Sequence, residues 1–232
     1  MDNRVPVRVH DLGLTDFARA WELQEETLRS VAEQKIAART SPDLRPECHL
    51  FLVEHPPVLT LGKSGSEENL LVPAETLQQL GISFYKINRG GDITYHGPGQ
   101  IVVYPVWDLD QIYTDIHRFL RELEEVVIRT LADFGIADAS RKEGLTGVWV
   151  GEEKICAMGI RASRWITMHG IALNVNTELE NFNLILPCGI VGKGVCSMQS
   201  ILGRPVPEPQ VRERLLVHFQ DVFPITLVAD AG

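Results

Sequence analysis

Three strand-like runs follow one another in the second half of the chain, with no helical pattern between them. They cover residues 147–150, 154–162 and 167–175 and are rich in apolar side chains. Residues 151–153 (GEE) are a tight-turn signal between the first two runs. Strands joined by short turns pair antiparallel, whereas parallel strands need a long crossover connection. This region therefore fits a largely antiparallel or mixed sheet better than a doubly wound parallel one.

The rest of the chain alternates extended and helical patterns. Further strands are expected over residues 5–10, 49–53, 58–61, 82–87 and 101–107. Helices are expected from an N-cap at Thr15 to about Arg39, from Pro73 to a stop at Gly81, over 115–134, and over 207–222. Residues 181–200 read as irregular. This order predicts an α+β fold with a mixed sheet flanked by helices, and one domain over residues 1–232.

Composition excludes several classes of protein. The 22 basic and 31 acidic side chains give a net charge of -9, which disfavours binding to nucleic acid or to an anionic membrane. No apolar run approaches the ~18 residues that span a bilayer, and the N-terminus lacks the apolar core of a signal peptide. No Cys and His spacing suggests a metal site. We expect a cytoplasmic protein with reduced thiols, no metal, no membrane contact and no nucleic-acid partner.

The segment 89–100 (RGGDITYHGPGQ) contains four glycines and a proline. Glycine lets the backbone approach a ligand closely and exposes N–H groups to it. The segment lacks the phosphate-loop pattern, and it leads into a strand, whereas a dinucleotide-binding loop opens a helix. It therefore indicates either a ligand-binding loop of another kind or a plain connection between strands.

Among the four cysteines, Cys188 has a distinct context. Pro187 and Gly189 flank it, which predicts irregular backbone that can present a side chain to a ligand. Cys48 and Cys156 lie in apolar strands and read as small buried hydrophobes, and Cys196 is ambiguous. Cys188 is thus the candidate nucleophile, with an ordinary packed thiol as the alternative.

A thiol needs a nearby cation or base to react near neutral pH, because its unperturbed pKa is about 8.5. Lys154 is one candidate, at the start of a mostly apolar strand, although its local context by itself favours the solvated end of a hairpin. His96 and His169 are the other candidates. Each histidine could instead be a hydrogen-bonded structural residue.

Four segments, in order, resemble the octanoyltransferase family of lipoate biosynthesis. They are the glycine-rich segment 89–100, then 151–160 (GEEKICAMGI), 169–175 (HGIALNV) and 187–189 (PCG). The stretch 55–62 (HPPVLTLG) also fits, so the likeness extends from about residue 50 to residue 203. The family often has Gln or Lys where this chain has Asp92.

The resemblance implies an acyltransferase. Octanoyl would pass from the phosphopantetheine thioester of acyl carrier protein to a cysteine, and then to a lysine of a lipoyl domain. Acceptors would be 2-oxoacid dehydrogenase subunits and the glycine-cleavage H protein. Neither ATP nor a metal is implied, because the acyl group arrives already activated. The implied fold is the biotin/lipoate protein ligase catalytic domain, which adds a smaller sheet to the mixed one.

Carried over residue by residue, the resemblance implies Cys188 as nucleophile and Lys154 as its partner, which would lower the thiol pKa and move protons. The implied acyl pocket consists of Arg89, Gly90, Gly91, Asp92, Ile93, Thr94, Tyr95, His96, Ala157, Met158, Gly159, Gly170, Ile171 and Ala172.

Other functions remain open at this point. An ATP-dependent lipoate or biotin ligase would share the fold but would not need the cysteine. An amidotransferase would move octanoyl between two lipoyl domains. A non-catalytic acyl-binding protein and a Cys-His hydrolase are further alternatives.

A surplus of basic residues between 141 and 164 suggests a docking face for an acidic carrier protein. The basic residues of this stretch are Arg141, Lys142, Lys154, Arg161 and Arg164, and the acidic ones are Glu143, Glu152 and Glu153.

Overall fold

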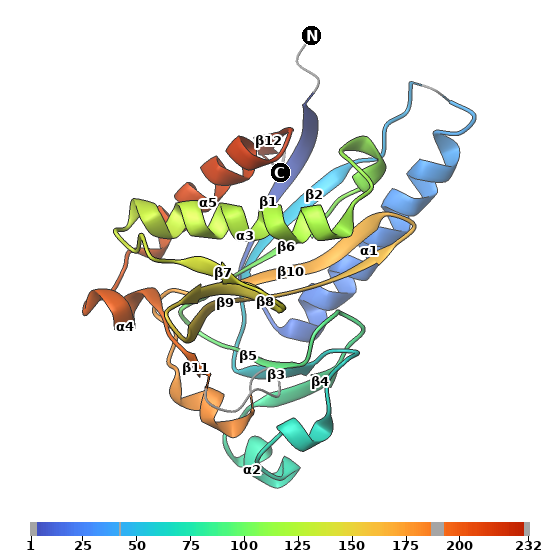
Figure 1. Ribbon diagram of the computed structural model, residues 1–232. Helices are drawn as coiled ribbons and strands as arrows, with labels where there is room; N and C mark the ends of the chain where they lie inside the picture. The colour runs from blue at the N-terminus through green and yellow to red at the C-terminus, as the bar shows by residue number, and fades with distance from the viewer. Residues whose placement is uncertain (1–3, 42, 187–192, 230–232) are drawn as a thin grey trace.

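A mixed β-sheet runs through the described part of the chain, which covers residues 4–41, 43–186 and 193–229 of a computed structural model (Figure 1). Its strand order is β12-β1-β2-β6-β10-β9-β8-β7, and β11 pairs with β9. The bounds are β1 Val5–Leu14, β2 Cys48–Glu54, β6 Gln100–Val106, β7 Ser140–Lys142, β8 Leu145–Val150, β9 Glu153–Ser163, β10 Ile166–Asn174, β11 Gly194–Val195 and β12 Ile225–Ala229.

The pairing directions confirm the expected α+β class. Strands β8, β9 and β10 pair antiparallel, as their short connections require, and β10, β6 and β2 continue the antiparallel arrangement. Strand β1 instead pairs parallel with both β2 and β12. The sheet is therefore mixed, and its antiparallel strands β9 and β10 contain the motifs 151–160 and 169–175.

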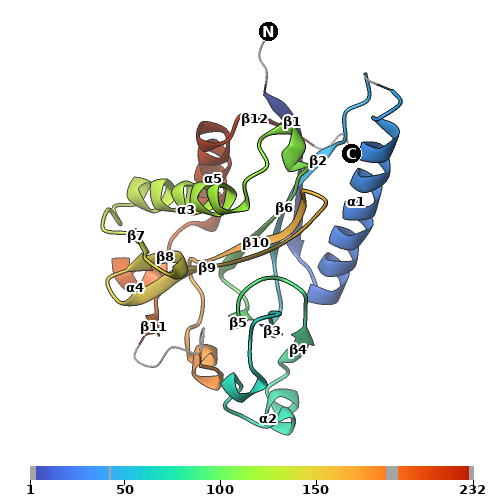
Figure 2. The same cartoon turned by 45° about the vertical axis from the view of Figure 1, so that its right-hand side comes forward.

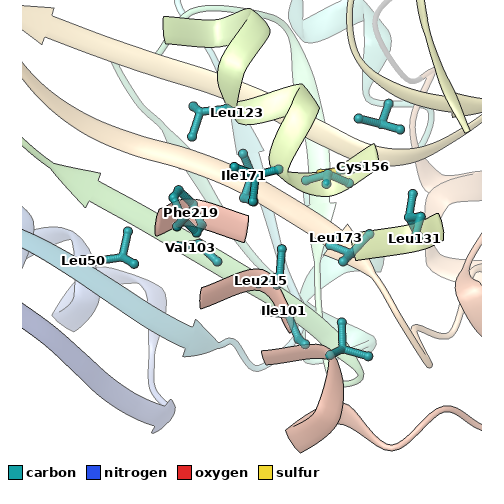
Figure 3. Close-up of a cluster of buried hydrophobic side chains, with 14 of the residues drawn as sticks. Leu50, Ile101, Val103, Leu123, Leu131, Cys156, Ile171, Leu173, Leu215 and Phe219 are labelled. Atoms are coloured by element: carbon teal, nitrogen blue, oxygen red, sulfur yellow. The ribbon is translucent and has the colours of Figure 1, made fainter. Parts of the chain in front are cut away.

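Helices cover both faces of this sheet (Figure 2). Helix α1 (Phe17–Ala37) lies on one face, and α3 (Ile116–Asp133) and α5 (Glu208–Val222) lie on the other. Figure 3 shows Leu123 and Leu131 of α3 and Phe219 of α5 packing onto Val103 and Leu173 of the sheet. Strands β6 and β10 are buried along their whole length because they have a helical layer on each side.

A smaller sheet of order β4-β3-β5 lies beside the large one. It comprises β4 (Ser83–Lys86), β3 (Val58–Leu61) and β5 (Ile93–His96), and α2 (Ala74–Gln79) packs on it. Strand β5 falls inside the glycine-rich segment, which read as a loop from sequence. Ile93 and Tyr95 alternate into the core of this small sheet, and that burial stabilises a strand despite the surrounding glycines.

Other boundaries also differ from the expectations. Asp16, and not Thr15, caps α1, because its carboxylate accepts from the Ala18 amide at 2.8 Å. The segment expected to be irregular contains β11 and α4 (Met198–Leu202). Strands β7 and β12 were not predicted, because β7 consists of just three residues, all of them polar, and β12 is a short edge strand. Short 3₁₀ turns occupy Glu67–Asn69, Leu109–Gln111 and Glu180–Leu184.

None of the helices within the described residues has the length and apolar character needed to cross a bilayer.

Candidate active site

A cavity of about 350 Å³ lies between the two sheets and the beginning of α1. Strands β9 and β10 supply one wall, β5 faces them, and Phe17 of α1 borders the space. A volume of this size is at the lower end of small-ligand pockets. The residues of the predicted pocket that line it are Arg89, Gly91, Asp92, Ile93, Thr94, His96, Ala157, Met158, Gly159, Gly170, Ile171 and Ala172, and Lys154 lines it as well.

Two residues of the predicted pocket do not line the cavity. Gly90 packs behind it, where its amide donates to the carbonyl of Ile160 at 2.9 Å. Tyr95 points to the opposite side of β5, where its hydroxyl accepts from the Asn181 amide group at 3.0 Å. Ile171 borders the cavity, but its side chain belongs to the core cluster beneath α3 and α5 (Figure 3). The alternation of side chains along a strand explains why Tyr95 and Ile171 point away from neighbours that face the cavity.

Small residues form a track along the paired strands β9 and β10. Ala157 lies opposite Ala172, and Gly159 lies opposite Gly170. A Cβ on Gly159 would lie 2.6 Å from the carbonyl oxygen of Gly90. Only glycine therefore lets the glycine-rich segment approach β9 this closely, and the track leaves room for a flexible apolar ligand.

Gly159→Ala is therefore expected to destabilise the fold by about 1–3 kcal/mol, because the added methyl group must push the glycine-rich segment off β9. Gly90→Ala is the matched control, since its Cβ would meet the Ile160 carbonyl oxygen at 3.4 Å, an ordinary contact. Denaturant unfolding of both variants measures the difference. Equal stability of the two would show that the segment does not pack on Gly159 as described.

Lys154 owes its position in the cavity to an irregularity in β9. Val148 lies opposite Cys156, but the next residue, Trp149, lies opposite Lys154, so Ile155 is an extra residue in the ladder. Such a bulge changes which face the following side chains occupy. Ile155 and Cys156 both pack into the core beneath α3 and α5, and Lys154 faces the cavity.

The ammonium group of Lys154 is held in a protected setting. Its side chain is 9% exposed, and Nζ lies 4.8 Å from the centre of the Trp149 ring, within range of a cation–π interaction. The alternative interpretation, in which Lys154 is the solvated end of a hairpin, is therefore wrong. A buried cation beside a cavity suits a role in chemistry.

Cys188 lies outside the described residues, but the chain on both sides of it is anchored, and the segment after it is bonded to Lys154. Before it, the Leu186 amide donates to the Asn69 carbonyl at 2.7 Å. After it, Val195 pairs with Lys154, and the Cys196 amide donates to the Lys154 carbonyl at 3.1 Å. Strand β11 (Gly194–Val195), which begins six residues after Cys188 in the sequence, is thus the described segment that pairs with Lys154.

The described cysteines are poor nucleophiles. Cys48, Cys156 and Cys196 are buried, and burial raises the pKa of the Cys48 and Cys196 thiols to about 12 and that of the Cys156 thiol further. These thiols therefore stay protonated near neutral pH. The expectation that Cys48 and Cys156 are packed hydrophobes is confirmed, and Cys196 joins them.

Two histidines, His96 and His169, line the cavity, and His55 packs behind His96 with ring centroids 5.9 Å apart. His55 bonds the Thr15 carbonyl at 2.7 Å and the Tyr104 hydroxyl at 2.8 Å, and His96 bonds the Gln100 side chain at 2.8 Å. His169 is 2% exposed, and its Nε2 has no hydrogen-bond partner among the described residues. Burial lowers the pKa of both His96 and His169 to about 3, so both rings are neutral at neutral pH.

Arg89 and Asp92 organise the glycine-rich segment itself. The Arg89 guanidinium donates to the Thr60 carbonyl at 2.9 Å and to its hydroxyl at 3.0 Å, which ties the segment to β3. Asp92 accepts from the Asn69 side chain at 2.6 Å. Both residues line the cavity, and both also hold its wall in place.

Sequence reasoning missed several lining residues, including Phe17, Ile87, Gln100, Val102, Tyr104 and Asn174. They read as ordinary helix and strand positions, and only the packing of α1 and β6 around β10 brings them to the cavity. Two of them carried a signal: Gln100 ends the glycine-rich segment, and Asn174 lies in the motif 169–175. Within the described residues, no three His, Cys, Asp or Glu side chains converge to hold a metal ion.

The basic residues between 141 and 164 do not form one free face. Arg141 forms ion pairs with Glu124 and Glu125 of α3, and Arg161 pairs with Glu25 of α1 on the other side of the sheet. These ion pairs use the charges of Arg141 and Arg161 within the fold, which argues against residues 141–164 as a docking face for an acidic carrier protein.

Comparison with known proteins places this chain in a family. A family model of the lipoyl protein ligase A/B catalytic domain matches residues 16–220. An octanoyltransferase of Flavobacterium johnsoniae is 51% identical over 229 residues, covering 96% of this chain and 98% of its relative.

Solved structures share the fold at low sequence identity. A bi-partite lipoate protein ligase from Thermoplasma acidophilum superposes with a TM-score of 0.67 at 18% identity, covering 98% of this chain and 88% of that one. Lipoate-protein ligase A with bound ATP gives 0.67 at 17% identity, covering 98% and 90%. These likenesses confirm the expected ligase-like fold. Together with the close sequence relative, they show that the chain belongs to the lipoyl protein ligase A/B catalytic-domain family and, within it, to the octanoyltransferases, which are acyltransferases.

Proposed function

We propose that this octanoyltransferase takes octanoyl from acyl carrier protein, carries it as a thioester on Cys188, and transfers it to a lysine of a lipoyl domain. The observation that supports this most directly is the pairing of Val195 with Lys154, because it ties the segment after Cys188 to the buried ammonium beside the cavity. Residues 1–232 act as one catalytic domain. The free thiol that the chemistry needs suits the cytoplasm.

In the first step, the Cys188 thiolate attacks the carbonyl carbon of the donor thioester. The tetrahedral intermediate collapses, the bond to the phosphopantetheine sulfur breaks, and that leaving sulfur takes a proton from Lys154. One thioester replaces another, so the step is nearly balanced in free energy.

In the second step, the lysine amine of the lipoyl domain attacks the acyl-enzyme carbonyl. The amine loses a proton to Lys154, and the Cys188 thiolate leaves. An amide replaces a thioester, and this change makes the overall transfer favourable without ATP or a metal. The acyl chain lies along the small-residue track of β9 and β10, where each buried methylene contributes about 0.8 kcal/mol.

Lipoyl domains of 2-oxoacid dehydrogenases and the glycine-cleavage H protein are the proposed acceptors. The solved Thermoplasma ligase was described together with its E2 lipoyl domain, and the shared fold supports a similar partner for this chain.

Incubation with octanoyl-acyl carrier protein and no ATP is expected to add one octanoyl group to the intact chain, and a lipoyl domain added next should remove it. Intact-protein mass spectrometry follows both steps. An absolute requirement for ATP would instead establish a ligase, and acylation only by an octanoylated lipoyl domain would establish an amidotransferase. Loss of the adduct to water alone would indicate a hydrolase.

A further inference from the structure

A line of buried hydrogen bonds runs through the cavity wall from β5 to the residue that follows β11. His96 Nδ1 bonds the Gln100 side-chain oxygen at 2.8 Å, and the Gln100 amide group donates to Asn174 Oδ1 at 2.9 Å. The Asn174 amide group in turn donates to the Cys196 carbonyl at 3.0 Å. His96, Gln100 and Asn174 are all buried, and all three line the cavity.

Each donor and acceptor in this line is fixed by its neighbours. A carbonyl oxygen only accepts, so Asn174 presents its NH₂ group to Cys196 and its oxygen to Gln100. Gln100 uses its NH₂ group a second time, on the Tyr95 carbonyl at 3.2 Å, and has its oxygen left for His96. The His96 ring therefore carries a proton on Nδ1. Asn174 cannot turn its amide group over without losing the bonds at both of its ends.

The line ends at the backbone of Lys154. The pairing of β10 with β9 stops at Leu173 and Cys156, and β11 then takes the place of β10 beside Lys154. The Cys196 amide donates to the Lys154 carbonyl at 3.1 Å. Asn174 is the last residue of β10, so its side chain joins the two strands at the point where one replaces the other.

We propose that Asn174 is a positioning residue for the transfer reaction: by holding Cys196, it fixes the backbone of Lys154 and thereby the location of the ammonium group in the cavity. The proposal rests on the octanoyl transfer described above, in which Lys154 moves the protons. A proton donor must lie within hydrogen-bond reach of the atom that it serves, and a displacement of about 1 Å can slow a reaction about a hundredfold. Asn174 needs no contact with the substrate for this role.

Hydrogen–deuterium exchange of the full chain, followed by NMR, tests the anchor without any acyl group. Asn174→Leu keeps the size and branching of the side chain but cannot donate to the Cys196 carbonyl. The Cys196 amide should then exchange about ten- to a hundredfold faster, the range expected when a buried hydrogen bond loses one partner. Helix α4 should stay in place, because the Gln199 amide donates to the Val175 carbonyl at 2.9 Å.

Steady-state transfer kinetics of the same variant test the role in the reaction. Asn174→Leu is expected to lower kcat about ten- to a hundredfold and to leave KM for both carrier proteins near its natural value. Asn174→Asp is a second variant for the case in which leucine does not fit. An ionised aspartate still accepts from Gln100, but it has no NH₂ group for Cys196.

Asn176→Leu is the matched control. The Asn176 side chain also holds a backbone segment, since it donates to the Val206 carbonyl at 2.9 Å and accepts from the Val206 amide at 2.8 Å. It does not line the cavity and has no bond to Cys196. Its variant should keep the natural kcat and the natural exchange rate at Cys196.

A natural kcat in a folded Asn174 variant would show that the anchor is structural only and would overturn the proposal. Unchanged exchange at Cys196, a rise in KM at constant kcat, or an equal loss of kcat in Asn176→Leu would overturn it as well. The proposed function would fail in the natural chain itself, which would then transfer no octanoyl. Failure of the positioning role appears only in the variants, so the two failures are distinguishable.

Discussion

Cys188→Ser is expected to lower the rate of octanoyl transfer by about a thousandfold or more, because the hydroxyl that replaces the thiol is not ionised near neutral pH and attacks a thioester poorly. Single-turnover transfer from octanoyl-acyl carrier protein to a lipoyl domain measures the effect. The thioester adduct should also disappear from the intact-protein mass.

Cys48→Ser is the matched control for that experiment. Cys48 is buried in β2 and does not line the cavity, so its variant should transfer octanoyl at the natural rate. If Cys188→Ser retained the natural rate, the acyl-enzyme mechanism would be wrong and direct transfer between the two carrier proteins would replace it.

Lys154→Met is expected to slow transfer by about a hundred- to ten-thousandfold, the usual contribution of a positioned proton donor and acceptor. Methionine preserves the apolar stem against Trp149 but removes the ammonium. Without that cation, the pKa of the Cys188 thiol should rise, and the pH at which iodoacetamide alkylates it should rise in parallel.

Lys142→Met provides a matched control for the lysine prediction. Lys142 Nζ also lies over the Trp149 ring, at 5.4 Å, but it pairs with Glu152 and does not line the cavity. Its variant should transfer normally. An unchanged alkylation profile in Lys154→Met would remove the electrostatic activation of Cys188, and only the proton-transfer role would remain.

Much of the site could be predicted from the sequence, because its glycine, histidine and lysine residues occur in short, distinctive motifs. The motif order of residues 89–100, 151–160 and 169–175 indicated the family, and most of its residues line one cavity. Tyr95 and Gly90 were grouped with them by adjacency alone. Neighbours in a strand point to opposite faces, so a contiguous motif always includes residues that support the wall from behind.

The fold class, the family and the candidates Cys188 and Lys154 could all be predicted from residue patterns, since they follow from strand order and from motifs within short segments. Which side chains face the cavity depends on how distant strands and helices pack together. The bulge at Ile155 turns Lys154 inward, and Gln24 of α1 accepts from the His169 amide, which holds His169 at positive φ in the cavity wall. Both depend on contacts with β8 and α1, distant in the chain, and no local pattern encodes such contacts.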